Sequence, residues 1–214
     1  MSDLTFEITD AHAEPYAAVP TMAFRMRITE ADARPIHSVV LRTQIQIEAQ
    51  RRHYAHAEER RLLELFDTPA RWGETLKPML WTHVTTIVPA FEGVVEIDIP
   101  VACTYDFEVT GAKYLHALDD GEIPLLFLFS GTVFARTGNG FAVDQVPWDR
   151  ESTYRLPVRV WRELMNAYFP GGAWLRLRRD SFDALHRFKA DRALPTWDAA
   201  IDALLEGAVT KEPA

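Results

Sequence analysis

Residues 94–109 read VVEIDIPVACTYDFEV, and apolar and polar side chains alternate here over a longer stretch than anywhere else in the chain. Successive side chains of a β-strand point to opposite faces, so this pattern predicts a half-buried strand, or two strands in line with a bend at Pro100. The buried face would carry Val95, Ile97, Ile99, Val101, Cys103, Tyr105, Phe107 and Val109. The other face would carry the acidic residues Glu96, Asp98, Asp106 and Glu108. The stretch therefore predicts a sheet with an acidic outer face and with Cys103 as part of the core.

Further strands are expected on both sides of this stretch. A short strand is expected over residues 6–9, and residues 24–28 form a second alternating run. Residues 39–47 alternate in the same way, and these last two runs are predicted to form an antiparallel pair. Residues 123–134 are apolar on both faces, which is typical of a strand in the middle of a sheet or between layers. The sequence TGNG at 137–140 then predicts a hairpin turn, with a return strand over 141–146.

Helical periodicity replaces the strand pattern from about Arg159. Helices are expected near residues 159–168, 181–188 and 196–204, in addition to a short earlier helix over 60–66. A chain in which the strands come first and the helices follow is typical of an α+β fold. We therefore expect an antiparallel β-sandwich-like body followed by a C-terminal helical segment packed on it. The expected boundaries are mainly β over 1–147, mainly helical over 148–207 and a frayed tail over 208–214, all within a single domain over 1–214.

The composition argues against several classes of protein. A formal net charge of −8 disfavours nucleic-acid binding, which needs a basic surface, and a single Cys rules out a disulfide framework or a Cys-built metal site. The first ten residues lack the features of a signal peptide, and the most apolar run, residues 123–129, is too short to span a bilayer. We expect a cytoplasmic protein without membrane insertion.

The charge is unevenly distributed along the chain. Between Arg150 and Arg192 there are ten basic and five acidic residues, a net charge of +5, which leaves −13 for the rest of the chain. Such asymmetry can steer an acidic protein partner towards the basic region. It can equally let the two regions neutralise each other within one fold. The acidic strand face and the Arg-rich helical part together indicate docking rather than catalysis.

No stretch forms a recognisable catalytic or cofactor motif. The densest group of possible metal ligands, His53 and His56 with Glu58 and Glu59, is flanked by arginines that would repel a cation, so a solvated helix start is favoured. The Asp-Asp-Gly sequence at 119–121 lies between two expected strands, where Asp serves turn geometry. We therefore predict no catalytic, cofactor-binding or metal-binding residues.

Six segments carry a resemblance to a known family. They are LRTQIQIE (41–48), RWGETLKPMLW (71–81), ACTYDFEVTGAKYLHAL (102–118), IPLLFLFSGTVF (123–134), 146–164 and 195–205. In these segments the chain resembles the domain of unknown function 6084 family, an uncharacterised bacterial family. Members tend to be encoded in clusters with [NiFe]-hydrogenase structural and maturation genes, and no catalytic residues are assigned to them. The resemblance implies an accessory role beside that enzyme, by association rather than by chemistry.

These observations favour a non-catalytic accessory or adaptor protein that supports assembly or maturation of a [NiFe]-hydrogenase through protein–protein contacts. Trp, Tyr and Arg are the residue types that anchor interfaces. The candidate interaction surface consists of Trp161, Arg162, Tyr168, Trp174, Arg176, Arg178 and Arg179. One alternative is a chaperone-like binder of immature subunits that presents an apolar loop with Trp72 and Trp81. Another is an enzyme of unrecognised class whose pocket, between sheet and helices, uses His83, His116 or Asp106.

Overall fold

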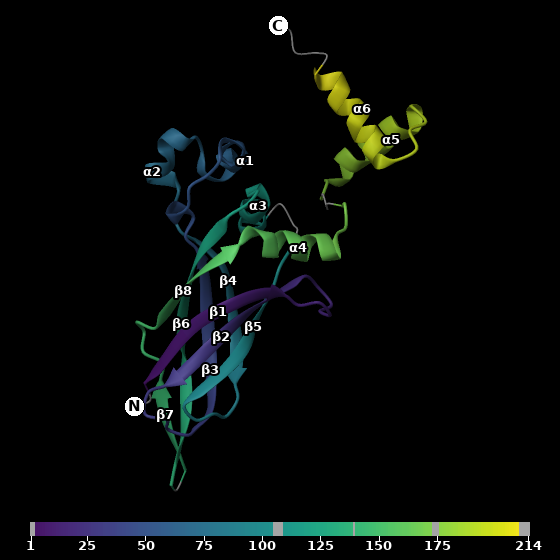
Figure 1. Cartoon of the computed structure of the whole chain (residues 1–214). Coiled ribbons are helices and arrows are strands. Elements are labelled where there is room, and N and C mark those ends of the chain that lie inside the picture. The colour runs from purple at the N-terminus through teal and green to yellow at the C-terminus, as the bar shows by residue number, and fades with distance from the viewer. Residues whose placement is uncertain (1–2, 105–108, 139, 173–175, 210–214) are drawn as a thin grey trace. The chain divides into compact units, whose positions relative to one another are not determined.

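The computed structural model describes residues 3–104, 109–138, 140–172 and 176–209. It divides the chain into two compact units, Met1–Ala173 and Trp174–Ala214, which we call unit 1 and unit 2. Unit 1 is built from two antiparallel sheets with helices, and unit 2 contains two further helices (Figure 1). The α+β class with C-terminal helices is therefore confirmed. The single domain over 1–214 stays a prediction.

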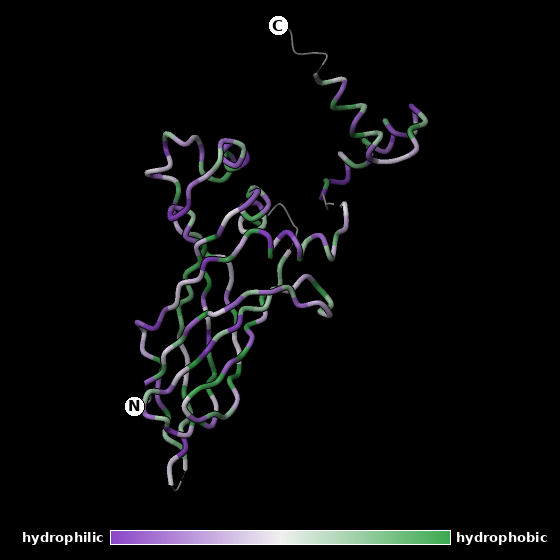
Figure 2. Tube along the Cα trace, in the orientation of Figure 1, coloured by the Kyte–Doolittle hydropathy of each residue, from purple (hydrophilic) through white to green (hydrophobic). Residues whose placement is uncertain are grey.

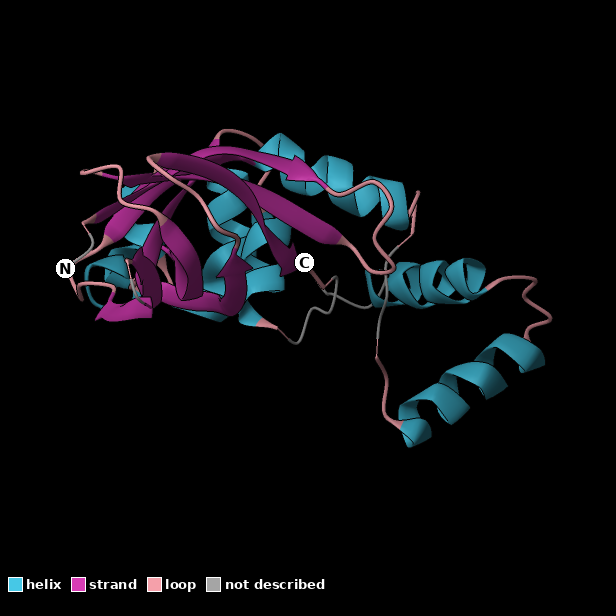
Figure 3. Cartoon of the chain, turned by 90° about the horizontal axis from the view of Figure 1, so that it is seen from below, coloured by secondary structure: helices cyan, strands magenta, loops and turns pink. Residues whose placement is uncertain are grey.

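The two sheets of unit 1 face each other as a sandwich (Figure 3). Sheet A contains, in spatial order, β1 (Leu4–Ala13), β2 (Thr21–Glu30) and β5 (Val94–Ala102). Sheet B contains, in spatial order, β4 (Met79–Val88), β3 (Ile36–Ile47), β6 (Glu122–Thr137) and β7 (Gly140–Gln145), with β8 (Glu151–Pro157) also paired to β6. The long strand β6 thus pairs with β3 on one side and with both β7 and β8 on the other. The loop 146–150 between β7 and β8 consequently lies beside the middle of β6.

Short helices gather at one end of the sandwich, and strand β7 lies at the other end (Figure 1). They are the 3₁₀ helices η1 (Ala49–Arg51) and η2 (Pro69–Arg71) and the α-helices α1 (His56–Phe66), α2 (Trp72–Thr75), α3 (Thr110–Ala117) and α4 (Val158–Tyr168). Helix α4 packs against β1, β2 and β8 through buried residues that include Val158, Trp161 and Leu164. In unit 2, α5 (Arg179–Asp191) and α6 (Trp197–Val209) pack on each other.

An aromatic cluster fills the space between the sheets. The ring of Phe24 on β2 contacts Phe127, Trp81 and Tyr154, with centroid distances of 5.2, 6.0 and 6.2 Å, and all three partners lie in sheet B. Phe6 of β1 stacks on Phe129 of β6 at 4.5 Å. Apolar residues follow the strands of the sandwich in Figure 2. The hydrophobic effect on these inward faces holds the two sheets together.

The alternation over residues 94–109 is confirmed in its first part only. In β5, Ile99 and Val101 are buried, while Glu96 and Asp98 are exposed. The strand ends at Ala102 instead of continuing to Val109, and α3 begins at Thr110. The predicted strand residues 105–108 lie outside the described residues.

The predicted pairing of the runs 24–28 and 39–47 is wrong. Strand β2 lies between β1 and β5, whereas β3 lies between β4 and β6, so the two runs belong to different sheets. Their patterns agree because each strand buries one face towards the same interior from opposite sides. Alternation shows which face is buried but not which strand is the neighbour.

Three further features differ from the expectation. Strand β4 was not predicted, because the region with Trp72 and Trp81 was expected to be a loop; Trp81 lies in β4 and Trp72 in α2. The strand-rich part extends past residue 147, since β8 occupies Glu151–Pro157. The helix α6 continues through Val209, and residues 210–214 lie outside the described part.

Candidate functional site

The outer face of sheet A is a network of ion pairs. Arg25 lies 3.1 Å from Asp98, and Arg27 lies 2.8 Å from Glu96 and 3.4 Å from Glu7. Hydrogen bonding to these carboxylates raises the pKa of both arginines. The acidic face expected from the sequence is therefore paired with arginines of its own sheet. This face is typical of a solvated surface, since exposed ion pairs interact well with water.

The outer face of sheet B has the opposite character. We use the name sheet B face for the outward-pointing residues of β3, β4 and β6, together with the neighbouring Val143 and Trp148. The strand members are Val40, Arg42, Gln44 and Gln46 of β3, Leu80, His83, Thr85 and Ile87 of β4, and Leu126, Leu128, Ser130 and Thr132 of β6. Strands β3 and β4 contain no Asp or Glu, whereas Glu151 of β8 lies opposite Leu128 and Asp149 follows Trp148 in the loop. Depletion of charge is the composition found at the centre of protein interfaces.

Large apolar side chains are exposed on the sheet B face. The exposed fractions are 41% for Val40, 52% for Leu80, 71% for Ile87 and 60% for Val143. Single exposed apolar residues are ordinary, but several on one charge-poor sheet face mark a contact surface.

The centre of the sheet B face is a hollow of about 430 Å³. Its lining is Arg42, Gln44, His83, Leu128, Phe129, Ser130 and Trp148. The strand register explains this arrangement. Arg42 of β3 is paired with Ser130 of β6, and Gln44 of β3 is paired with His83 of β4. The Nε2 atom of His83 lies 3.2 Å from the side-chain oxygen of Gln44. The hollow is therefore fixed by the pairing of three strands.

Arg42 and Trp148 stand out within this hollow. Arg42 makes no ion pair and no side-chain hydrogen bond with any residue that the structure describes. Trp148 is 94% exposed, in the loop between β7 and β8. Backbone bonds anchor this loop on both sides, from Val146 N–H to Gly131 O at 2.9 Å and from Phe129 N–H to Arg150 O at 3.0 Å. An unpaired guanidinium beside an exposed indole presents the two side chains that most often dominate binding energy.

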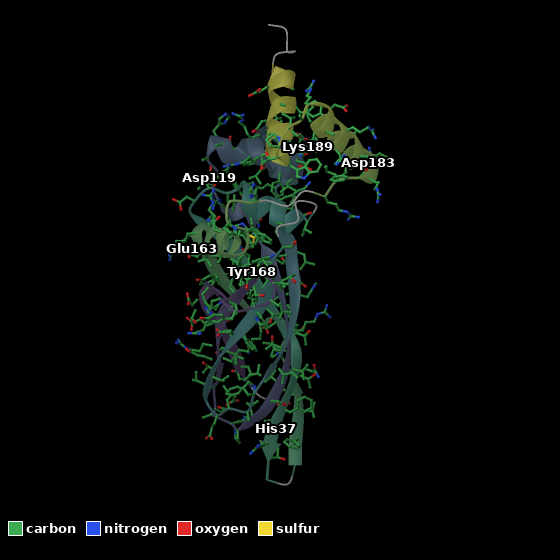
Figure 4. The ribbon with its side chains drawn as sticks, turned by 90° about the vertical axis from the view of Figure 1, so that its right-hand side faces the viewer. His37, Asp119, Glu163, Tyr168, Asp183 and Lys189 are labelled. Atoms are coloured by element: carbon green, nitrogen blue, oxygen red, sulfur yellow. The ribbon has the colours of Figure 1, made fainter. Side chains whose placement is uncertain are left out.

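Three residues of the predicted interaction surface belong to unit 1. Trp161 is only 3% exposed and forms part of the core, while Arg162 donates a hydrogen bond to the backbone oxygen of Asp119 at 2.9 Å. The hydroxyl of Tyr168, a residue labelled in Figure 4, donates to the backbone oxygen of Ala17 at 2.7 Å. These three side chains therefore have partners within unit 1.

The other four residues of that surface belong to unit 2. Arg176, Arg178 and Arg179 are exposed there, and Trp174 lies outside the described residues. A common interaction surface made of these seven residues stays a prediction.

The Asp-Asp-Gly sequence at 119–121 forms a turn, as expected. Gly121 has a φ of +83°, and the carboxylate of Asp119 accepts hydrogen bonds from Arg61 and Arg162. These arginines lower the pKa of Asp119. Asp119 thereby links α1 and α4 to this turn at the helical end of the sandwich (Figure 4).

The residues considered for catalysis or metal binding do not converge. His83 lines the hollow of the sheet B face, whereas His116 lines two hollows at the helical end, and Asp106 lies outside the described residues. Burial, together with Arg61 and Arg162, lowers the pKa of His116. Among the described residues there is no group of three or more His, Cys, Asp or Glu side chains that could hold a metal ion.

Cys103 is a core residue, as predicted. It is 7% exposed, and burial raises its pKa to about 12, so the unreactive thiol form dominates. The loop tryptophans considered for a chaperone also pack against the core, and the indole of Trp72 donates to the backbone oxygen of Asp67 at 3.0 Å. Trp72 and Trp81 therefore form no exposed apolar loop.

The signals for the sheet B face were present in the sequence but incomplete. The alternation over 39–47 predicts that Arg42, Gln44 and Gln46 point outward, as they do. The apolar residues on both faces of 123–134 predicted a central strand, and β6 is central. The apolar residues on the outer side of sheet B are exposed because no other element of unit 1 covers them in the described part of the chain. The alternation of apolar and polar residues does not predict whether a sheet face is covered.

Comparison with known proteins gives a family but no function. No curated protein sequence matches the chain. A β-glucosidase from Kluyveromyces marxianus is similar over 72% of this chain and 15% of its own, with 8% identity and a TM-score of 0.27. The CARDB domain of the PF1109 protein from Pyrococcus furiosus is similar over 73% of this chain and 92% of its own, with 11% identity and a TM-score of 0.26. At TM-scores this low, neither similarity supports an inference about fold or function.

None of the helices in the described part of the chain has the length and apolar character needed to cross a membrane. The model of one family matches residues 1–213, almost the whole sequence. The chain therefore belongs to DUF6084, a family of unknown function.

Proposed function

We propose that this protein is a non-catalytic accessory protein that binds a protein partner through the sheet B face. The observation that carries the proposal is the unpaired Arg42 beside the exposed Trp148 in a charge-poor, partly apolar sheet face. Burying Trp148 would remove a large apolar surface from water. Trp and Arg at the centre of a patch are the usual anchors of an interface.

The chemistry of the sheet B face restricts the partner. Arg42 would be buried on binding, and a buried guanidinium needs a carboxylate to pair with. Neither β3 nor β4 supplies one. The partner surface therefore carries an Asp or Glu opposite Arg42, surrounded by apolar side chains that cover Ile87 and Val143.

We further propose that the partner is a [NiFe]-hydrogenase or one of its maturation components, in the cytoplasm. The support for this choice is the gene context that the family resemblance implies, together with a single Cys, which suits a reducing compartment. The sheet B face supports the proposal of a protein–protein contact, and the gene context of the family supports the choice of partner.

Affinity purification from the native host tests this proposal. The tagged protein, produced under hydrogenase-inducing conditions, should recover a hydrogenase or maturation component that mass spectrometry identifies. Trp148→Ala and Arg42→Glu should lose this partner, because each removes one anchor of the contact. Recovery of the wild-type protein alone would contradict the proposal.

Two matched variants serve as controls. Tyr16→Ala removes an aromatic side chain that is 93% exposed, between β1 and β2. Arg60→Glu makes the same charge change as Arg42→Glu at an exposed position of α1. Both should retain the partner, and equal loss in all four variants would show that the sheet B face is not the binding site.

A further inference from the structure

The helical hairpin of unit 2 has too little core to be stable alone. Among the described residues from 176 onward, Ala200 is the one fully buried side chain. Phe182 of α5 and Trp197 of α6 lie with ring centroids 5.3 Å apart, but both remain about two-fifths exposed, at 43% and 39%. Helix pairs of this size need additional contacts to bury their apolar faces.

The unburied apolar side chains form a stripe along α6. Trp197, Ile201 and Leu204 follow each other at helical spacing, with Leu205 beside them. Their exposed fractions range from 39% for Ile201 to 60% for Leu205. Phe182 of α5 packs on Trp197, whereas Ile201, Leu204 and Leu205 remain more than a third exposed.

The two arms of the hairpin differ in net charge. Helix α6 carries acidic side chains only, at Asp198, Asp202 and Glu206, one helical turn apart. Residues 176–192, which contain α5, carry six basic side chains, Arg176, Arg178, Arg179, Arg187, Lys189 and Arg192, against three acidic ones, Asp180, Asp183 and Asp191. Over residues 174–214, seven basic and seven acidic residues cancel. The hairpin is therefore neutral as a whole but has one acidic helix.

Some of these charged side chains form no ion pair within the described part of the chain. Asp198 and Asp202 form no ion pair with any residue that the structure describes, and the same holds for Arg187. Lys189, which Figure 4 labels, has its Nζ atom 5.6 Å from the centroid of the Trp197 ring. A basic side chain thus borders the apolar stripe of α6.

We infer that unit 2 binds unit 2 of a second copy of this chain, forming a four-helix bundle. A two-fold axis brings α6 of one copy against α5 of the other, and the reciprocal contact follows by symmetry. The apolar stripes then form a common core, and the acidic side of α6 lies against the basic residues of the partner's α5. Six basic and three acidic side chains give residues 176–192 a net charge of +3, and the three acidic side chains give α6 a net charge of −3, so two hairpins complement each other when the arms of opposite net charge meet. The dimer would carry two copies of the sheet B face.

Sedimentation velocity of the full chain tests this inference. The wild-type protein should be a dimer, and Leu204→Asp should raise the dissociation constant of the dimer at least about tenfold, because it places a charge in the shared core. Ile87→Asp, which changes an exposed apolar residue of the sheet B face, should remain a dimer. A monomeric wild-type protein would overturn the inference. So would a dimer that Ile87→Asp disrupts and Leu204→Asp does not.

Charge-reversal variants of α5 and α6 distinguish loss of the dimer contact from loss of folding. The variant Asp198→Lys/Asp202→Lys and the variant Arg187→Glu/Lys189→Glu should each dissociate, because each brings like charges together across the axis. A mixture of the two should form a heterodimer, since opposite charges meet again. Failure of the mixture to associate, while both variants keep the helical circular dichroism of the wild type, would overturn the inference.

Discussion

The carboxylate of Glu58 lies 2.7 Å from the guanidinium of Arg52, and the two side chains are only 4% and 8% exposed. Arg52 also donates to the backbone oxygens of Asp120 at 2.6 Å and Glu122 at 3.0 Å. Glu58 accepts the backbone N–H of Ala55 at 3.0 Å, at the start of α1. This pair therefore joins α1 to the turn before β6.

Replacing Arg52 should destabilise the fold strongly. Arg52→Met leaves the carboxylate of Glu58 buried without its cation, and we expect the free energy of unfolding to fall by about 3–5 kcal/mol. Chemical denaturation followed by tryptophan fluorescence measures the change. Arg71→Met is the control, because Arg71 pairs with Asp67 in an exposed position and should matter far less. Similar losses in both variants would contradict the role of the buried pair.

Gly131 is required where β6 passes β3. Its φ is +155°, and a Cβ atom would lie 2.2 Å from the backbone oxygen of Val40. Gly131→Ala should therefore lower the free energy of unfolding by at least about 2 kcal/mol. In Gly138→Ala the added methyl group meets no atom within 4 Å, so this variant should remain close to the wild type. Equal stability of the two variants would contradict the β3–β6 register.

Alkaline pH should weaken the fold through Tyr54. Its hydroxyl donates to the backbone oxygen of Ala49 at 2.7 Å and lies 2.8 Å from the hydroxyl of Tyr114. Burial raises the pKa of Tyr54 from 10 to about 12 and raises that of Tyr114 as well. The folded state thus holds the proton more tightly than the unfolded state. The stabilisation is complete below pH 10 and is lost between pH 10 and about 12.

Equilibrium unfolding at a series of pH values measures this loss. Tyr54→Phe should be less stable at neutral pH, because two hydrogen bonds are removed. Its stability should also fall less steeply above pH 10, since one of the two buried hydroxyls no longer titrates. Parallel pH profiles for the variant and the wild type would contradict the assignment.

The sequence predicts individual faces of strands better than their neighbours. Leu41 and Ile45 point inward and Arg42 outward, as alternation requires, because each strand has one buried face. The pairing of β2 with β3 was wrong, since strands that bury the same interior from opposite sheets have the same pattern. β5 was expected to continue past Ala102, although α3 follows, because apolar residues in both elements face the core.

The candidate site was harder to predict than the fold. Trp161 was chosen as an interface residue by its type, yet α4 buries it against the sandwich. Trp148 lies in a loop, and its exposure depends on how β7 and β8 both pair with β6. Glu96 and Asp98 suggested an acidic docking face, but the arginines that neutralise them come from β2, whose place beside β5 local sequence does not encode.

The affinity of the sheet B face for its purified partner tests the central claim most directly. Isothermal titration calorimetry with the co-purified hydrogenase or maturation component would compare the wild type, Arg42→Glu and Arg60→Glu. Placing a carboxylate of the protein against a carboxylate of the partner should weaken binding at least about thirtyfold in Arg42→Glu, with no change in Arg60→Glu. Equal dissociation constants for the wild type and Arg42→Glu would contradict the account.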